Sequence, residues 1–302
     1  AREVAARLRD AGCRDFFVAH WGEAAAIADI IPPAWISVLN GIQAADIPHI
    51  RALGAVPVLN TPEQLSMWQA SGGGRCHIMF DSGINRLGIG PEQMSQCDLG
   101  SMDIDLLLSH LASADEDSAQ NDAQQRLFHE HAAVSGAKRL SLANSAGIML
   151  GADYHYDLTR PGISLYGGIA RPGMEAFIKP VARLSARLLQ VRSLPAGAPI
   201  GYNATHICGN DTTVGTISMG YADGYLRAFS SKGTAHHGAA ALPVLGRVSM
   251  DLVTIDISAA PELREGDWVE VEYDLPTASA LTGLSQYELL TNLGTRFERI
   301  WR

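Results

Sequence analysis

The chain has little of what several protein classes need. Of its 302 residues only four are cysteine, and no two cysteines have the C-x-x-C spacing. A chain this long can bury a core without disulfides, so we expect neither a disulfide framework nor a zinc knuckle, and a reducing cytoplasmic compartment fits best. No apolar run reaches about 18 residues, which excludes a transmembrane helix. The first residues also lack the apolar core of a signal peptide.

Positive charge is scarce as well. There are 23 Lys and Arg residues against 32 Asp and Glu residues, which gives a net charge of −9. This balance argues against nucleic acid or an anionic membrane surface as the main partner. Only three of the basic residues are lysines: Lys138, Lys179 and Lys232.

Apolar residues are plentiful. They make up 47% of the chain, and charged residues 18%, so a large core can form and a disordered chain is excluded. The length predicts about two domains.

The first part of the chain alternates short apolar runs with helix-like stretches. The runs predict buried strands at 16–20, 35–39, 56–59, 77–80, 106–110, 140–144 and 163–166. Helical patterns lie between them, for example at 63–71 and 115–135. Continuous apolar strands alternating with helices predict a parallel sheet that is buried on both faces.

These elements fit an α/β fold, a TIM-type (β/α)8 barrel, with one strand absent. The chain begins in a helical pattern at 1–11 and has no initiator Met, so we expect the first strand to precede Ala1. A barrel without it is expected to be open at one edge. Polar side chains follow several strands, namely His20, Asn40, Asp81, His110 and Asn144. In such barrels the active site is built at this rim.

The pattern changes after about residue 178. Strand-like runs follow at 182–191, 212–219, 240–248, 252–257 and 269–273, with Pro, Gly and Asn-Asp turns between them and no helical alternation. We therefore predict an α/β barrel, the cofactor-binding domain, over 1–178, and a mostly β domain over 179–302.

Two loops of the predicted barrel carry candidate anion sites. Arg86 lies just beyond a strand tip, where it can hold a carboxylate, although a surface arginine on a loop is the plainer interpretation. Ser145 and the backbone N–H groups of Gly162 and Ile163 suit a phosphate, because barrels often bind phosphate after their last two strands. Two ordinary glycine-containing loops remain the alternative.

Three further features have weaker signals. Tyr221, between glycines, can act as a base only if its environment lowers its pKa; otherwise it is an aromatic plug. His110 can stack on a ring or can simply be a hydrogen-bonded polar residue. The pair His236 and His237 lacks a third ligand, so no metal is expected.

Taken together, these segments resemble the alanine racemase family, pyridoxal-phosphate enzymes of fold type III with an N-terminal α/β barrel and a C-terminal β domain. The matching segments span nearly the whole chain in the family's order: 81–88 (DSGINRLG), 110–116 (HLASADE), 143–146 (ANSA), 160–167 (RPGISLYG), 220–224 (GYADG), 246–251 (GRVSMD), and the closing stretch from Tyr287 through Arg296 to Arg299.

The resemblance implies roles for individual residues. Tyr221 would handle the proton on one face of the substrate α-carbon, acting across a dimer interface. Arg86 and the Met250 backbone would contact the substrate carboxylate. The cofactor pyridoxal 5′-phosphate would meet Arg160 at its pyridine nitrogen and His110 beside its ring. Its phosphate would be held by Ser145, Gly162, Ile163 and Tyr287.

The resemblance also implies a function. A small amino acid, expected to be alanine, would be racemised by two bases acting on its imine with the cofactor, in a homodimer that supplies D-alanine for cell-wall precursors. Serine or a larger amino acid remains open as a substrate. A decarboxylase of the same fold is an alternative, but Arg160 and the 220–224 segment argue against it, because a decarboxylase needs a protonated pyridine.

Two features depart from the family pattern. The lysine that bonds the cofactor lies in a segment that we expect just before Ala1, and none of the chain's three lysines lies in a segment that could replace it. Without that lysine the chain would be inactive, which leaves a non-catalytic cofactor-binding protein as a further alternative. Met79 stands where many family members carry a carbamylated lysine.

Overall fold

The chain forms two compact units, Ala1–Gly162 and Ile163–Arg302, in a computed structural model that describes all 302 residues. Each unit is described by itself. None of the helices combines the length and the hydropathy that crossing a bilayer would need.

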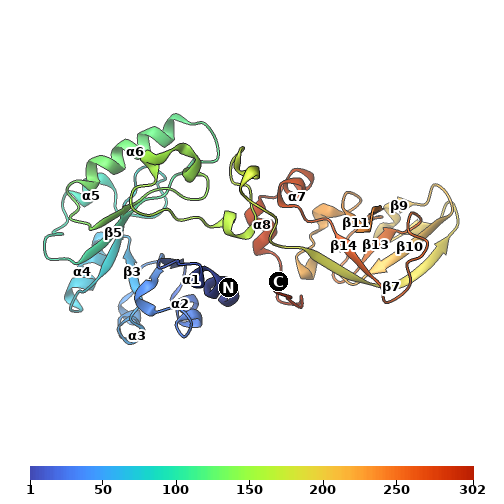
Figure 1. The fold of residues 1–302 in the computed structure, drawn as a ribbon, viewed down its shortest axis with the longest axis horizontal. Coiled ribbons are helices and arrows are strands. Elements are labelled where there is room, and N and C mark those ends of the chain that lie inside the picture. Colours follow the sequence, from blue (N-terminus) through green and yellow to red (C-terminus); the bar gives the residue numbers. More distant parts are fainter. The chain divides into compact units, whose positions relative to one another are not determined.

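Unit 1 is a curled sheet of six parallel strands in the order β1-β2-β3-β4-β5-β6. The strands are β1 Phe16–Val18, β2 Ile36–Val38, β3 Val56–Leu59, β4 Cys76–Met79, β5 Ile104–Leu108 and β6 Arg139–Ser141. The helices on the outer side are α1 Arg2–Asp10, α2 Trp21–Ile27, α3 Ile47–Leu53, α4 Pro62–Ala70, α5 Pro91–Met94 and α6 Ala119–Ala132 (Figure 1). This arrangement confirms the TIM-like α/β architecture.

Local sequence explains where several of these elements begin and end. The Thr61 side chain accepts a hydrogen bond from the Gln64 N–H and caps the start of α4. The Ser118 side chain accepts one from the Gln120 N–H and caps the start of α6. Gly54, with a φ of 78°, ends α3 in the left-handed conformation that glycine tolerates best. All four residues of β3 and of β4 are buried, and the one polar side chain among them, His77, is hydrogen-bonded to Ser37.

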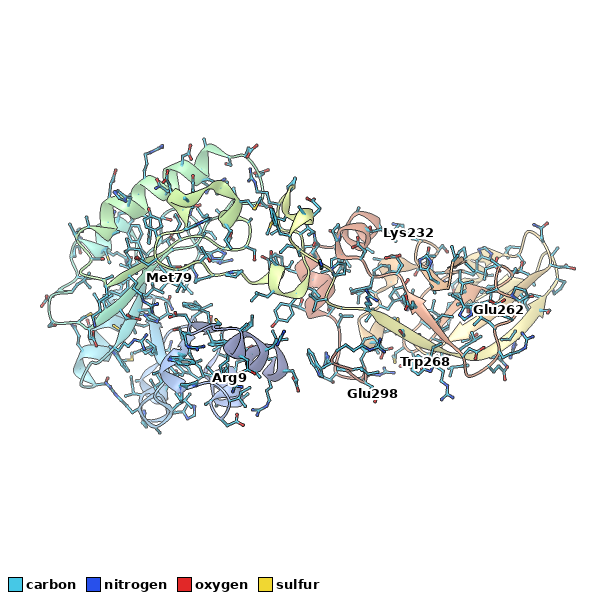
Figure 2. All side chains as sticks on the ribbon, in the orientation of Figure 1. Arg9, Met79, Lys232, Glu262, Trp268 and Glu298 are labelled. Carbon is cyan, nitrogen blue, oxygen red and sulfur yellow. The ribbon has the colours of Figure 1, made fainter.

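The concave side of the sheet has its own apolar cluster. Val58, Met79, Leu106 and Leu108 are buried there, and Leu158 packs against them. Figure 2 shows the Met79 side chain among the strands of unit 1. This interior is filled by side chains, as in other barrels of parallel strands.

The seventh predicted strand, 163–166, is wrong. Residues Ile163–Tyr166 form a 3₁₀ helix, η5, with the Gly168 N–H donating to the Ile163 carbonyl. Pro161 has no N–H to give to a ladder, and the following glycines favour a turn. Just before this segment, Arg160 forms an isolated parallel bridge with Asn144.

The first and last strands, β1 and β6, are not hydrogen-bonded to each other, but an ionic cluster joins their starting ends. Arg139, in β6, lies 2.8 Å from Asp15, just before β1, and 2.8 Å from Asp105 in β5. Arg75 adds a second contact to Asp105 at 2.7 Å. The two carboxylates are 18% and 13% exposed, so the arginines neutralise mostly buried charge.

Unit 2 contains an antiparallel six-stranded sheet in the order β12-β11-β14-β7-β10-β13. Its strands are β7 Leu184–Leu194, β10 Thr212–Ile217, β11 Thr234–His237, β12 Ala240–Pro243, β13 Val253–Asp256 and β14 Trp268–Val271. Two short strands, β8 Pro199–Ile200 and β9 His206–Ile207, form a separate pair. The prediction of a mostly β second part is confirmed.

This second sheet nearly closes on itself. Val244 bridges Ile255 and the Leu245 N–H donates to Thr254, so the chain after β12 meets β13 at the far edge. The enclosed core includes Tyr225 stacked on Phe229 at 4.3 Å. Closure removes the exposed edges that open sheets present.

Two details of the prediction for this unit are wrong. The run 240–248 is not one strand, because Pro243 cannot donate to a ladder and β12 ends there. Two helices were also missed, α7 Leu275–Thr282 and α8 Gln286–Thr291. Asp274 and Ser285 cap them, and Ser285 with Glu288 forms the S-x-x-E capping box that could have revealed α8.

The ionic cluster makes a prediction about stability. Replacing Arg139 by Ala should lower the free energy of unfolding of unit 1 by about 2 kcal/mol, between the values for exposed and buried ion pairs. Burial raises the pKa of Asp105, but hydrogen bonds from Arg139 and Arg75 outweigh it and lower that pKa to about 2. The stabilisation should therefore be complete above about pH 4, the ordinary range of an unfolded aspartate, and be lost as pH falls toward 2.

Urea unfolding of wild type and Arg139→Ala at several pH values measures this difference. Arg2→Ala serves as the control, because its partner Asp29 is 65% exposed and the loss should be negligible. Equal unfolding midpoints for Arg139→Ala and wild type at pH 7 would refute the role of the cluster.

Candidate active site

The polar residues predicted to share a rim lie where the strands of unit 1 end. His110 follows β5, the loop carrying Arg86 follows β4, and Arg160 is bridged to Asn144 beyond β6. Because carboxyl ends of parallel strands meet at one edge of a sheet, the topology puts these three cationic or titratable groups at the same edge. The electrostatic effect of both arginines on His110 agrees with this placement.

A tight loop presents Arg86. Asp81 Oδ1 accepts hydrogen bonds from the N–H groups of Gly83 (2.9 Å) and Asn85 (3.1 Å) and holds the first turn. The loop returns at Gly88, where a side chain would lie 2.8 Å from the Asp81 nitrogen, so only glycine fits. Arg86 itself is exposed and has no hydrogen-bond or salt-bridge partner in the chain, which leaves its guanidinium available for an anion.

Arg160 is the partly buried cation of this rim. Its guanidinium donates to the Ser141 hydroxyl and to the Ser109 carbonyl, and both acceptors are uncharged. Burial lowers its pKa to about 10, so it stays protonated at neutral pH. An arginine enclosed with no carboxylate beside it is suited to a further acceptor on a ligand.

His110 is neutral at physiological pH. Burial is the largest cause, and the positive charges of Arg160 and then Arg86 add to it, so that the pKa falls to about 4. A neutral imidazole beside two arginines can accept or donate one hydrogen bond without adding a third positive charge.

The proposed phosphate loops do come together. Ser145 is buried, and its Oγ accepts the N–H of Gly162 at 2.8 Å. Gly162 is exposed, and nothing lies within 4 Å of where its side chain would be, so the backbone can be approached closely. Ile163 comes next and begins η5, whose first N–H groups have no partners within the helix. Backbone N–H groups and a hydroxyl in this order suit an anion.

Tyr287 is placed by helix α8 of unit 2. Gln286, its neighbour, donates to the Ile169 carbonyl at 2.9 Å and accepts the Ile169 N–H at 2.8 Å. These two bonds hold the start of α8 beside the segment that follows η5. The Tyr287 side chain is 55% exposed.

Tyr221 begins a short 3₁₀ turn, η8 Tyr221–Asp223, in unit 2. The turn lies directly on the neighbouring loop, since a side chain at Gly220 would lie 2.3 Å from the Met250 carbonyl oxygen. The Tyr221 N–H donates to Ser249 and the Ala222 N–H donates to Met250, each at 3.0 Å. The guanidinium of Arg227 stands over the Tyr221 ring at 5.2 Å.

Met250 therefore lies beside Tyr221, as the predicted site requires of unit 2. Its carbonyl is engaged by the Ala222 N–H, but its own N–H has no partner in the chain, and its side chain is 53% exposed. A carboxylate is one group that such an open donor can bind.

Comparisons with known proteins bear on both units. The family model described as alanine racemase, N-terminal domain matches residues 1–170, and the one described as alanine racemase, C-terminal domain matches residues 181–301. The chain belongs to the alanine racemase family. These two matches follow the order of the two units along the chain.

Individual family members are similar over almost the whole chain. A catabolic alanine racemase of Agrobacterium fabrum is 39% identical, covering 98% of this chain and 81% of its own length. An alanine racemase of Brucella canis is 38% identical, covering 100% and 84%. The crystal structure of alanine racemase from Bartonella henselae with covalently bound pyridoxal phosphate has a TM-score of 0.91 and 33% identity, covering 99% and 88%. These relatives favour a racemase over the decarboxylase alternative.

Lys138, the one lysine of unit 1, lies away from the rim. Lys138 comes just before β6, at the opposite end of that strand from Arg160, and pairs with Asp103 at 2.6 Å. Lys232 lies at the surface of unit 2 and donates to the Leu281 carbonyl (Figure 2). Met79 is buried in the apolar interior of unit 1.

The histidine pair of the second unit has carboxylate partners. His236 lies 3.1 Å from Glu272, and His237 lies 3.6 Å from Glu262. The chain shows no group of three His, Cys, Asp or Glu side chains arranged to hold a metal ion.

The pKa of His110 is open to direct test. Replacing the exposed Arg86 by Met removes one positive charge, so the pKa should rise from about 4 but stay below its usual 6.5, because burial and Arg160 remain. A titration of the His110 imidazole by NMR measures it. Arg160→Met should raise the pKa further than Arg86→Met does, and a His110 that already titrates near 6.5 in the wild type would contradict the site geometry.

Proposed function

We propose that this chain is a pyridoxal-phosphate-dependent alanine racemase that interconverts L-alanine and D-alanine. Membership of the family and the bound cofactor of the Bartonella relative support this activity. The observation from this chain that carries the proposal is Arg160, a protonated and enclosed arginine whose partners at the rim are all uncharged. It is complementary to an acceptor such as a pyridine nitrogen.

The chain's own groups fit the cofactor. Ser145 and the N–H groups of Gly162 and Ile163 would hold its phosphate. Nothing obstructs the approach to Gly162, and the phosphate would take the Gly162 N–H that Ser145 Oγ accepts in this structure. Tyr287 would add a hydroxyl, and His110, being neutral, would pack beside the ring. When bound, the cofactor withdraws electrons from the substrate α-carbon and makes its proton acidic.

Arg160 would set the electronic character of the site. A guanidinium does not readily give up its proton, so it would donate a hydrogen bond to the pyridine nitrogen and leave that nitrogen unprotonated. This limits how far negative charge is drawn into the ring and disfavours side reactions such as transamination.

Two groups would bind the substrate carboxylate. Arg86 has an unpaired guanidinium, and Met250 has an unpaired backbone N–H. Both donors point to an anionic substrate group. We propose that Arg86 serves the site of its own barrel and that Met250 serves the site of a partner subunit.

Racemisation requires a proton to leave one face of the α-carbon and another to be added on the opposite face. We propose Tyr221 of the partner subunit as the acid–base group on one face, and on the other the cofactor-bonding lysine that we expect just before Ala1. Such a division makes a homodimer necessary, since neither chain would hold both carboxylate contacts and both bases.

Two further assignments complete the proposal. We place the cofactor-binding domain at 1–178 and the β domain at 179–302, because the first strand of the second sheet begins only at Leu184. A cytoplasmic location is supported by the four cysteines, all of which are free thiols in a long chain.

Tyr221→Phe tests the acid–base role in the full-length protein, since we expect the cofactor-bonding lysine just before Ala1. The variant should lose about 10²- to 10⁴-fold in kcat, because the phenol proton is the group exchanged, while cofactor affinity stays within a factor of about two to three. Polarimetry with L- and D-alanine and absorbance titration with pyridoxal phosphate give the two quantities. Unchanged turnover in both directions would rule out the role.

Mixing two inactive variants tests the shared site. Tyr221→Phe and Arg160→Leu place their defects in the two halves of the proposed active site. If these halves come from different subunits, heterodimers gather both defects into one site and leave the other intact. Random reassortment should then restore about one quarter of wild-type activity. No recovery, with exchange of subunits shown by native mass spectrometry, would mean that each chain forms its own site.

A further inference from the structure

The closing segment of the chain lies against the turn that carries Tyr221. The Gly294 N–H donates to the Asp223 carbonyl at 3.1 Å. Gly224 has a φ of 101°, and a side chain there would lie 2.3 Å from the Asn292 carbonyl oxygen. The chain's last segment therefore packs on the η8 turn as closely as backbone allows.

One side chain from this segment joins two loops of unit 2. Arg296 Nε lies 3.1 Å from Asp223 Oδ1, and Arg296 Nη1 lies 2.7 Å from Asp251 Oδ1. Asp223 is the last residue of the Tyr221 turn, and Asp251 directly follows Met250. The planar guanidinium thus spans the loops that hold the proposed base and the proposed carboxylate contact.

Of the two carboxylates, Asp223 depends more on a partner for its charge, because it is the more buried. Its side chain is only 10% exposed, and its other oxygen, Oδ2, accepts the Gly220 N–H at 2.8 Å. That bond closes the turn around Tyr221 from within. Without Arg296, a mostly buried carboxylate would keep only backbone donors, and the turn would have to open toward water to solvate it.

We propose that Arg296 is a positioning residue that holds the Tyr221 turn and the Met250 loop in fixed relation to each other. It does not touch substrate or cofactor; it acts through Asp223 and Asp251. This inference rests on the proposed acid–base role of Tyr221 and assigns to the chain's closing segment the task of keeping that phenol in place.

The proposal has a directional consequence. Tyr221 removes the α-proton from one enantiomer and, in the reverse reaction, delivers a proton to that same face, so a misplaced phenol slows the transfer on one face only. The step that Tyr221 performs then becomes more rate-limiting. With α-deuterated substrates, the primary isotope effect should rise for the enantiomer that Tyr221 deprotonates and fall toward 1 for the other. General loss of folded protein moves neither value.

The test compares three variants of the cofactor-loaded protein. Arg296→Ala should lower kcat by about 10²-fold, the size expected from a displacement of about 1 Å, and should produce the unequal isotope effects. Arg296→Lys keeps the charge but cannot span both carboxylates, so it should recover part of the loss. Arg264→Ala is the matched control, because the Arg264 guanidinium donates only to the carbonyls of Pro261 and Leu263 in its own loop. It should leave both isotope effects unchanged.

A second readout needs no turnover. With 3-fluorotyrosine at position 221, the ¹⁹F resonance should shift or broaden in Arg296→Ala and stay in place in Arg264→Ala. Equal isotope effects in both directions together with an unmoved ¹⁹F resonance would overturn the proposal. If the proposed role of Tyr221 itself is wrong, the result differs: Tyr221→Phe then retains racemisation, whether or not Arg296 is replaced.

Discussion

The candidate site of the first unit depends on one positive charge, that of the Arg160 guanidinium, whose hydrogen-bond acceptors in the chain are uncharged. Arg160 reaches the sheet through its bridge to Asn144, and its guanidinium is taken up by a hydroxyl and a carbonyl. An arginine in such surroundings stays charged even though burial lowers its pKa to about 10. Burial, with this charge and that of Arg86 adding to it, keeps His110 neutral. The rim therefore offers hydrogen-bond donors and positive charge. A cofactor with a pyridine nitrogen and a phosphate presents the matching acceptor atoms and anionic group.

In the second unit, the surrounding loops hold the phenol of Tyr221 in a fixed position. Tyr221 lies on a turn of only three residues, which has little stability of its own. The turn is stabilised instead by its neighbours. Its backbone donates hydrogen bonds to the carbonyls of Ser249 and Met250, Gly220 packs closely on Met250, and Arg296 forms a salt bridge with Asp223. An acid–base group must be placed accurately relative to the proton that it transfers. Here several individually weak contacts to one turn fix the position of the phenol.

Sequence patterns predicted the first unit better than the second. Short, mostly apolar runs marked the parallel strands, so β1 to β6 were all found, and polar residues after the strands marked the rim. The error at 163–166 arose because a short apolar run is compatible with a strand or a helical turn, and Pro161 with the following glycines decided for the turn. In the second unit, Pro243 shortened a predicted strand, and the capping residues Asp274 and Ser285 of two helices were overlooked.

Resemblance to the alanine racemase family pointed to Arg160 and Met250, whereas the sequence by itself determined that a parallel α/β unit precedes a β-rich one and offered Arg86, His110 and Tyr221 as candidates. It did so because hydrophobic periodicity and loop chemistry are local properties. Tertiary structure alone decided that Arg296 reaches both Asp223 and Asp251, residues 73 and 45 positions away in the chain, and that Arg139 joins the first strand to the last. Contacts of this kind depend on how the chain returns on itself, and no local spacing encodes that distance.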